Sequence, residues 1–308
     1  MTPVTGHTSQ TMTPALSVVI PAVNGWADIN RCLTALESER EQLSLEVIVP
    51  ERSGPSVRQH IAERFPWVTV LPVTVSTSIP AMRAKGIRTA TAPTVAVIED
   101  HVIVQSGWAC AIAAARTSTS RVVGGHLVNT ATEKLVDWAA WLCEYHHLAN
   151  PMPAGIVPGL HGNHTAYDRE LLGAYQHVLD AEQWEDALHG ALQADGVALW
   201  SRPDIVAGHC KYYSVREYTS QRFLYSRAYA AMRGASMTAP RRLAYGVMTV
   251  LLPPVLLWRI VRQVRASETN RQHLLPSLPL LVLFAASWGV GEMVGAWFGD
   301  GGALAKVK

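Results

Sequence analysis

The stretch Val95-Ala-Val-Ile-Glu-Asp-His101 joins an apolar run to three polar residues. Its valines and isoleucine favour a buried β-strand of the kind found in parallel sheets. The C-terminal ends of such strands line the crevice where open α/β sheets bind ligands. Glu99 and His101 are two residues apart, so both side chains can lie on one side of an extended segment. A carboxylate and an imidazole can hold a divalent cation, and a cation can hold a diphosphate. The alternative is a strand end with solvated polar residues.

The same alternation continues on either side of this stretch. Short apolar runs alternate with amphipathic stretches up to about residue 128, which predicts parallel βαβ units. Ile29, Leu33 and Leu36 mark one predicted helix by their spacing. We expect strands at 16–20, 45–49, 68–71, 94–98 and 121–129, short β segments at 197–200 and 205–207, helices near 79–90, 106–115, 133–147, 168–176 and 184–194, and a loop at 150–162.

Composition limits the classes of function. The formal net charge of +2 predicts no nucleic-acid partner. Four widely spaced cysteines form no CxxC pair, which indicates reduced thiols in the cytosol rather than a disulfide or zinc framework. Residues 1–14 are polar and resemble no signal peptide, so we expect a disordered tail there.

Two uncharged runs near the end of the chain differ in kind from the rest. Residues 274–291 are long enough to span a bilayer. Residues 243–258 hold Pro253-Pro254, so they predict a kinked span, a re-entrant segment or an interfacial helix. A pair of buried core helices is the alternative. Arginines precede and separate the runs, which fits an anionic membrane surface. We therefore divide the chain into a tail (1–14), a catalytic domain (15–235) and a membrane-associated helical region (236–308).

Eight segments in order resemble motifs of the family 2 glycosyltransferases, over roughly residues 16–230. The first resembles the family's opening strand, which runs into Pro-x-x-Asn, and the fourth stands where the family places Asp-x-Asp. The others resemble its acidic second strand end, its Ala-Arg-Asn-x-Gly-Ile, Pro-Gly-Trp and Gly-Asn segments, its Glu-Asp pair and its late histidine. In this chain the segments are Leu16-Ser-Val-Val-Ile-Pro-Ala-Val-Asn24, Glu46-Val-Ile-Val-Pro-Glu51, Met82-Arg-Ala-Lys-Gly-Ile87, Ile98-Glu-Asp-His101, Gly107-Trp108, Gly162-Asn-His-Thr-Ala-Tyr-Asp-Arg-Glu170, Trp184-Glu-Asp186 and His209.

The resemblance implies a GT-A fold, which is a Rossmann-like mixed sheet flanked by helices, followed here by a hydrophobic helical hairpin. It also implies an inverting transfer of sugar from a nucleotide-diphosphate donor. Arg52 stands where the family has a second acid, and Glu99 and His101 replace the two carboxylates of Asp-x-Asp. The second change removes one negative charge, and imidazole suits Mn²⁺ better than Mg²⁺.

The donor and metal sites can be assigned residue by residue. Glu99, His101 and His209 are the predicted ligands of a divalent cation, Mn²⁺ or Mg²⁺. For His209 an ordinary core or surface histidine is the alternative, for Asn24 a helix cap, and for Arg83 a surface salt bridge. The predicted donor-binding residues are Pro21, Ala22, Asn24, Glu51, Arg83 and Asp100.

The predicted catalytic residues lie at the start of a helix. Asp186 is the expected base, because a helix dipole there keeps a carboxylate ionised. Glu185 is expected to orient the site or bind the acceptor, and ordinary N-terminal acids are the alternative. His161, Asn163 and His164 follow a Pro/Gly loop and are expected to face the acceptor.

The sequence thus predicts a membrane-associated glycosyltransferase with a cytoplasmic catalytic domain. The expected acceptor is a hydroxyl or phosphate group on a lipid-linked or cell-envelope glycan. Two rival functions stay open at this point. One is a sugar nucleotidyltransferase, although its usual Gly-rich phosphate loop is missing after the first strand. The other is an inactive, membrane-tethered scaffold that binds nucleotide-sugars, which the Glu-x-His substitution keeps open.

Overall fold

The first half of the sheet is parallel, as the alternation of strands and helices predicts. The computed structural model describes residues 13–146, 152–267 and 270–308. Within these residues the strands lie in the order β3-β2-β1-β4, and each neighbouring pair is parallel. Three helices connect them. The elements are β1 (Leu16–Val19), α1 (Trp26–Gln42), β2 (Leu45–Glu51), α2 (Pro55–Arg64), β3 (Val68–Pro72), α3 (Ile79–Thr89) and β4 (Thr94–Ile98).

The second half of the sheet is mixed. β8 pairs antiparallel with β4, β6 pairs antiparallel with β8, and β9 runs parallel to β6. β5 and β7 both pair antiparallel with β9. The predicted Rossmann-like mixed sheet with flanking helices is therefore confirmed. These elements are β5 (Val102–Val104), α4 (Trp108–Ala115), β6 (Val122–Asn129), α5 (Leu135–Tyr145), β7 (Gly155–Val157), β8 (His164–Asp168), α6 (Arg169–Ala174), α7 (Gln176–Asp180), α8 (Glu185–Ala194) and β9 (Leu199–His209).

Local sequence explains why α1 and α3 form where they do. Ile29, Leu33 and Leu36 are all fully buried, so the predicted stripe of α1 packs against the sheet. The side chain of Ser78 caps α3 by accepting a hydrogen bond from the backbone N–H of Ala81 (3.2 Å). Both helices thereby begin at the carboxyl edge of the sheet, beside the loops that form the site.

Two sequence predictions need correction near β9. The segments predicted at 197–200 and 205–207 belong to one strand, Leu199–His209. The pairing with β6 shifts between Gly125 and His126, opposite a stretch that contains Pro203. Proline has no N–H for the ladder and is tolerated at a bulge, so the interrupted pattern marks a bulge within one strand. The loop predicted at 150–162 contains β7, and its residues 150 and 151 lie outside the described residues.

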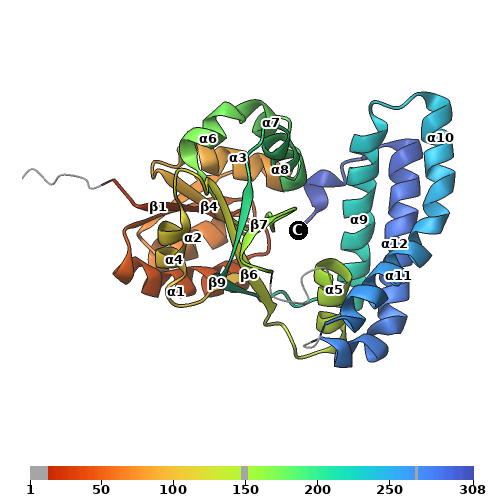
Figure 1. The fold of residues 1–308 in the computed structure, drawn as a ribbon, viewed down its shortest axis with the longest axis horizontal. Coiled ribbons are helices and arrows are strands. Elements are labelled where there is room, and N and C mark those ends of the chain that lie inside the picture. Colours follow the sequence, from red (N-terminus) through yellow and green to blue (C-terminus); the bar gives the residue numbers. More distant parts are fainter. Residues whose placement is uncertain (1–12, 147–151, 268–269) are drawn as a thin grey trace, which may run out of the picture.

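A bundle of helices stands beside the sheet, with α5 next to it (Figure 1). Helix α9 packs most extensively against α12. The sequence pattern did not predict helix α9. Pro253 and Pro254 lie in the first turn of α11, where a missing N–H leaves no helical bond unmade. The bundle consists of α9 (Val215–Gly234), α10 (Ala239–Met248), the 3₁₀ turn η2 (Thr249–Leu251), α11 (Leu252–Arg265), the 3₁₀ turn η3 (Arg271–His273) and α12 (Leu274–Phe298), and is followed by η4 (Leu304–Lys306).

Two helices of the bundle are long and apolar enough to cross a membrane. They run from Ala239 to Arg265 and from Arg271 to Phe298. Only 17% and 39% of their most apolar windows are buried, so neither is a mostly buried core helix. The predicted tail falls largely on residues 1–12, which lie outside the described residues.

Candidate active site

The turn after β4 is tied to the loop after β1 by one buried carboxylate. Asp100 is 1% exposed and accepts hydrogen bonds from the backbone N–H groups of Val23 (2.7 Å) and Asn24 (2.8 Å). The Asn24 side chain donates to its second oxygen at 2.7 Å. Gly25, and not Asn24, is the residue at the start of α1, and it makes no side-chain cap. Asn24 is therefore no helix cap here; with Asp100 it fixes the carboxyl edge of the sheet.

Glu99, His101 and His209 come together as a potential metal site. One potential ligand atom from each residue lies within 4.8 Å of the others. The Nε2 atom of His101 is 3.1 Å from Nε2 of His209 and 3.2 Å from a carboxylate oxygen of Glu99. Antiparallel pairing sets His209 of β9 opposite Val102 and so beside the turn.

The surroundings of His101 fit a metal ligand. Its Nδ1 atom lies 3.1 Å from a carboxylate oxygen of Asp100, which orients the ring so that Nε2 faces Glu99 and His209. A carboxylate behind a histidine is the usual arrangement at metal sites. One carboxylate with two imidazoles suits Mn²⁺ better than Mg²⁺.

The charges of the three groups are strongly coupled. Burial opposes ionisation of Glu99, but the hydrogen bond and charge of His101, together with the charge of Arg83, hold its pKa well below the usual range. Burial likewise opposes protonation of His101, but Asp100 and Glu99 raise its pKa to about 9. Burial, followed by the charge on His101, lowers the pKa of His209. His209 is therefore neutral and able to donate a lone pair, whereas a cation would replace a proton on His101.

Arg83 links the turn to α8. Its guanidinium lies 2.9 Å from Glu99 and forms an ion pair with Glu185. Arg83 is 5% exposed, so this is a buried cluster and not a surface salt bridge. Its Nε atom is buried without a hydrogen-bond partner in the described part of the chain. The guanidinium can thus donate to an anionic ligand in addition to its two carboxylates.

Apart from Arg83, the predicted donor-binding residues fall into two groups, one that lines a cavity and one that is buried. One small cavity is lined by Pro21, Asn24 and Asp100, together with Glu99 and His101 of the turn after β4. Ala22 and Glu51 do not line this cavity; both are fully buried and are joined by an isolated parallel bridge. Glu51 accepts hydrogen bonds from the Gly54 N–H and from Arg58, both at 2.9 Å, so its oxygens already have partners.

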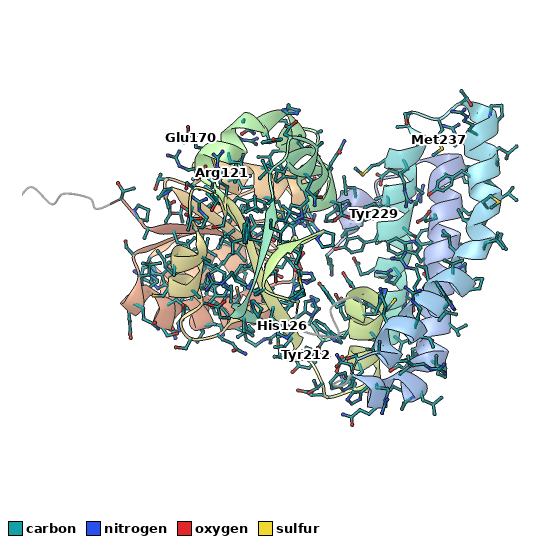
Figure 2. All side chains as sticks on the ribbon, viewed as in Figure 1. Arg121, His126, Glu170, Tyr212, Tyr229 and Met237 are labelled. Carbon is teal, nitrogen blue, oxygen red and sulfur yellow. The ribbon has the colours of Figure 1, made fainter. Side chains whose placement is uncertain are left out.

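Asp186 belongs to the start of α8, which lies beside α9 of the helical bundle. It is exposed in the first turn of that helix, as predicted. Trp184, which precedes the helix, stacks on Tyr229 with ring centroids 6.0 Å apart. Tyr229 projects from α9 towards the sheet (Figure 2). Burial, followed by the charge of Asp186, raises the pKa of Tyr229.

One of the residues expected at the acceptor side points elsewhere. Asn163 lies at the site and donates to Glu99 (3.2 Å) and to the Tyr145 hydroxyl (2.9 Å). His164 is instead fully buried and accepts a hydrogen bond from the Trp108 indole N–H (2.8 Å). Successive side chains of a strand point to opposite faces, so His164 faces α4 while its neighbour faces the site.

Sequence reasoning missed one wall of the site. A cavity beside the three potential metal ligands is lined by residues of α5, of α9, of the stretch after β9 and of the segment after η4, all distant in sequence. One signal in the sequence could have indicated this wall. It is the presence of a polar residue on a helix face that otherwise carries apolar or small residues. The additional lining residues are Glu144, Tyr145, Tyr213, Tyr218, Gln221, Arg222, Tyr225 and Lys308.

This combination of sheet, turn and charge cluster defines a nucleotide-diphospho-sugar transferase of the GT-A type. A sequence profile of Glycosyl transferase family 2 matches residues 17–175, just over half of the chain, and the protein belongs to that family. It is therefore a glycosyltransferase, and the alternative prediction of a sugar nucleotidyltransferase is wrong.

A solved structure extends the likeness of fold over nearly the whole chain. It is a mannosyltransferase from Pyrobaculum calidifontis in complex with GDP-Man and Mn²⁺. The match has a TM-score of 0.51 at 17% identity and covers 94% of this chain and 88% of that one. A search of curated proteins finds no match.

Proposed function

We propose that this protein transfers a sugar, with inversion, from a nucleoside-diphosphate donor to a hydroxyl or phosphate group of a lipid-linked acceptor. The observation that carries the proposal is the cluster of Glu99, His101 and His209 beside Arg83, at the carboxyl edge of a family 2 sheet. The likeness to a structure that contains GDP-Man and Mn²⁺ supports a nucleotide-sugar donor and a divalent cation.

The cluster provides what the departing diphosphate requires. Glu99, His101 and His209 would hold a divalent cation, which when bound stabilises negative charge on the diphosphate. Arg83 adds a fixed positive charge on the adjacent helix, held in place by Glu99 and Glu185. Such charges act without reorganisation, because the surrounding carboxylates already hold them in place.

Asp186 remains our candidate for the base that deprotonates the acceptor. Its neighbour Glu185 is committed to Arg83, whereas Asp186 makes no hydrogen bond or ion pair with the described residues. It lies in the first turn of α8, where the helix dipole favours the ionised carboxylate. Its exposure leaves the carboxylate free to accept a proton from an acceptor hydroxyl.

The outer surface of the bundle supports a membrane-borne acceptor. Large apolar side chains that soluble proteins rarely expose together lie on α10, η2 and α11, with exposed fractions of 60% for Leu243, 68% for Val250 and 60% for Trp258. Arg259, Arg262 and Arg265 follow at the end of that span. We infer that the two apolar helices lie in a membrane and hold the catalytic crevice near its surface.

A cytoplasmic catalytic domain is part of the same proposal. The four cysteines are free, and three of them are buried, which suits a reducing compartment.

The test uses full-length protein in detergent or lipid nanodiscs. It is incubated with GDP- and UDP-linked sugars, a membrane lipid extract and Mn²⁺, and radiolabelled sugar is followed into the lipid phase. We expect one donor to label lipid, and chelator to abolish the transfer. Label that enters only water-soluble acceptors would contradict the lipid-linked acceptor. Nucleotide-sugar binding without turnover in any condition would identify an inactive scaffold instead.

A further inference from the structure

The chain returns from the helical bundle to the catalytic sheet after α12. Residues 299–308, called the strap here, cross between the two parts, and their end lies in the gap between the sheet and α9 (Figure 1). Gly299, Gly301 and Gly302 have φ values of 76°, 57° and 75°, which only glycine adopts at little cost. The Arg227 side chain donates to the Gly299 carbonyl at 2.9 Å. The chain is thus turned sharply at the helix end and directed to the site.

A buried arginine holds the strap against the sheet. Arg52 follows β2 and is 8% exposed. Its guanidinium donates to the Ala305 carbonyl (3.1 Å), to the Val307 carbonyl and to Thr77 (2.6 Å). The resemblance to family 2 places an acid at this position. The change from acid to arginine replaces a group that repels carbonyl oxygens by one that binds them.

The side chain of Val307 anchors the strap a second time. It is fully buried in a small apolar cluster with Ile79 and Trp184, and Val23 packs at its edge. Val23 belongs to the loop after β1, and Ile79 begins α3. The strap therefore lies over the two elements that carry the predicted donor-binding residues.

Lys308 completes the closure of the site. It lines the cavity of the three potential metal ligands and also the cavity of Pro21, Asn24 and Asp100. Its backbone N–H donates to the Gln221 side chain of α9 at 2.9 Å. Each cavity has a volume of about 10 Å³, about enough for one water molecule. Sites for small-molecule ligands measure several hundred Å³ or more.

We propose that the strap is an autoinhibitory segment that competes with the nucleotide donor for this site. The inference rests on the proposed function, because it takes the two cavities as parts of the donor site. Donor binding requires Arg52 to release two carbonyls and Val307 to leave its apolar cluster. The strap continues directly from α12, so its displacement is coupled through the backbone to one of the two apolar helices.

The test compares nucleotide binding by four forms of the full chain in lipid nanodiscs. They are the unaltered protein, a deletion of residues 304–308, Val307→Asp and Lys306→Ala. Lys306 is exposed on the same segment, so its replacement leaves both anchors in place and serves as the matched control. The probes are GDP and UDP, each with Mn²⁺, titrated by calorimetry. Hydrogen exchange of residues 303–308 is measured with and without nucleotide.

We expect the deletion and Val307→Asp to bind the nucleotide about tenfold or more tightly than the unaltered protein, because the apparent affinity is the intrinsic affinity multiplied by the fraction of molecules in the open state. Lys306→Ala should stay within twofold. Nucleotide should speed exchange in the strap of the unaltered protein.

Equal affinity in all four forms, or slower exchange in the strap with nucleotide bound, would overturn autoinhibition and leave the donor site intact. No binding of either nucleotide to the deletion variant would overturn the donor site itself, and autoinhibition with it.

Discussion

The carboxylate of Asp100 holds the site together, and Asp100→Asn measures how much. Two backbone N–H groups and the Asn24 amide donate to it at 2.7–2.8 Å, and His101 lies 3.1 Å away. An asparagine keeps the shape and one acceptor oxygen but loses the charge. Hydrogen bonds to a charged group contribute about 1 kcal/mol more than neutral ones. Loss of charge at three bonds, less the relief of desolvation, predicts a destabilisation of about 2 kcal/mol.

The assay is thermal unfolding of the full-length protein in detergent, followed by tryptophan fluorescence. A change of about 2 kcal/mol corresponds to a fall in Tm of roughly 3 °C for a chain of 308 residues. Asp204→Asn is the matched control, because Asp204 is 54% exposed and, among the described residues, forms an ion pair with Arg202 alone. That pair should contribute less than about 1 kcal/mol. Equal Tm values for both variants would refute the view that Asp100 fixes the edge of the sheet.

Three further predictions follow from the same structure. Asp186→Asn should lower kcat by about 10²-fold or more with little change in nucleotide affinity, because it removes only the base, and kcat within a few-fold of the unaltered protein would remove Asp186 from that role. Burial lowers the pKa of His164 to about 3 and of His189 to about 4, below the unfolded value of about 6.5, so acid protonates the unfolded chain first. Stability should therefore fall from pH 6.5 downward by roughly 1 kcal/mol per pH unit for each histidine, and a Tm that is the same at pH 7 and pH 5 would contradict this. The full-length protein should float with lipid vesicles and resist extraction by alkaline carbonate, whereas recovery in the soluble fraction would show that the apolar surface meets another protein.

Strands β1 to β4 and the site turn could be predicted because their signals are local, whereas β5, β7 and β8 were not predicted. β4 occupies the predicted residues 94–98, and the acid and imidazole that follow it meet His209. A buried strand and its polar end appear as an apolar run followed by polar residues within a few positions. The order of the family motifs then identifies which strand ends belong to the site.

Helix α9 could not be predicted because its buried face carries no apolar stripe. The buried residues include Gln221, Ser226, Ala228 and Gly234. Small side chains there let α12 approach closely, and Gly291 and Gly295 of α12 meet the backbone of α9. Periodicity of large apolar residues, which sequence reasoning looks for, is absent from this kind of contact.

Contacts between residues that are distant in sequence form the strap and the wall of the site that α5 and α9 provide. Arg52 meets carbonyls more than 250 positions away, and backbone carbonyls leave no signal in a sequence. The departure from the family's acid at Arg52 was visible, but its partner was not.

We propose that Glu99, His101 and His209 hold one divalent cation that the reaction needs. The most direct measurement is a Mn²⁺ titration of the chelator-treated full-length protein, with bound ion followed by electron paramagnetic resonance and sugar transfer measured in parallel. We predict one bound Mn²⁺ per chain, recovery of activity over the same concentration range, and a shift of both to at least tenfold higher Mn²⁺ in His101→Ala. Full activity in the presence of chelator, or an unchanged titration in His101→Ala, would show that these three residues do not hold a cation that the reaction needs.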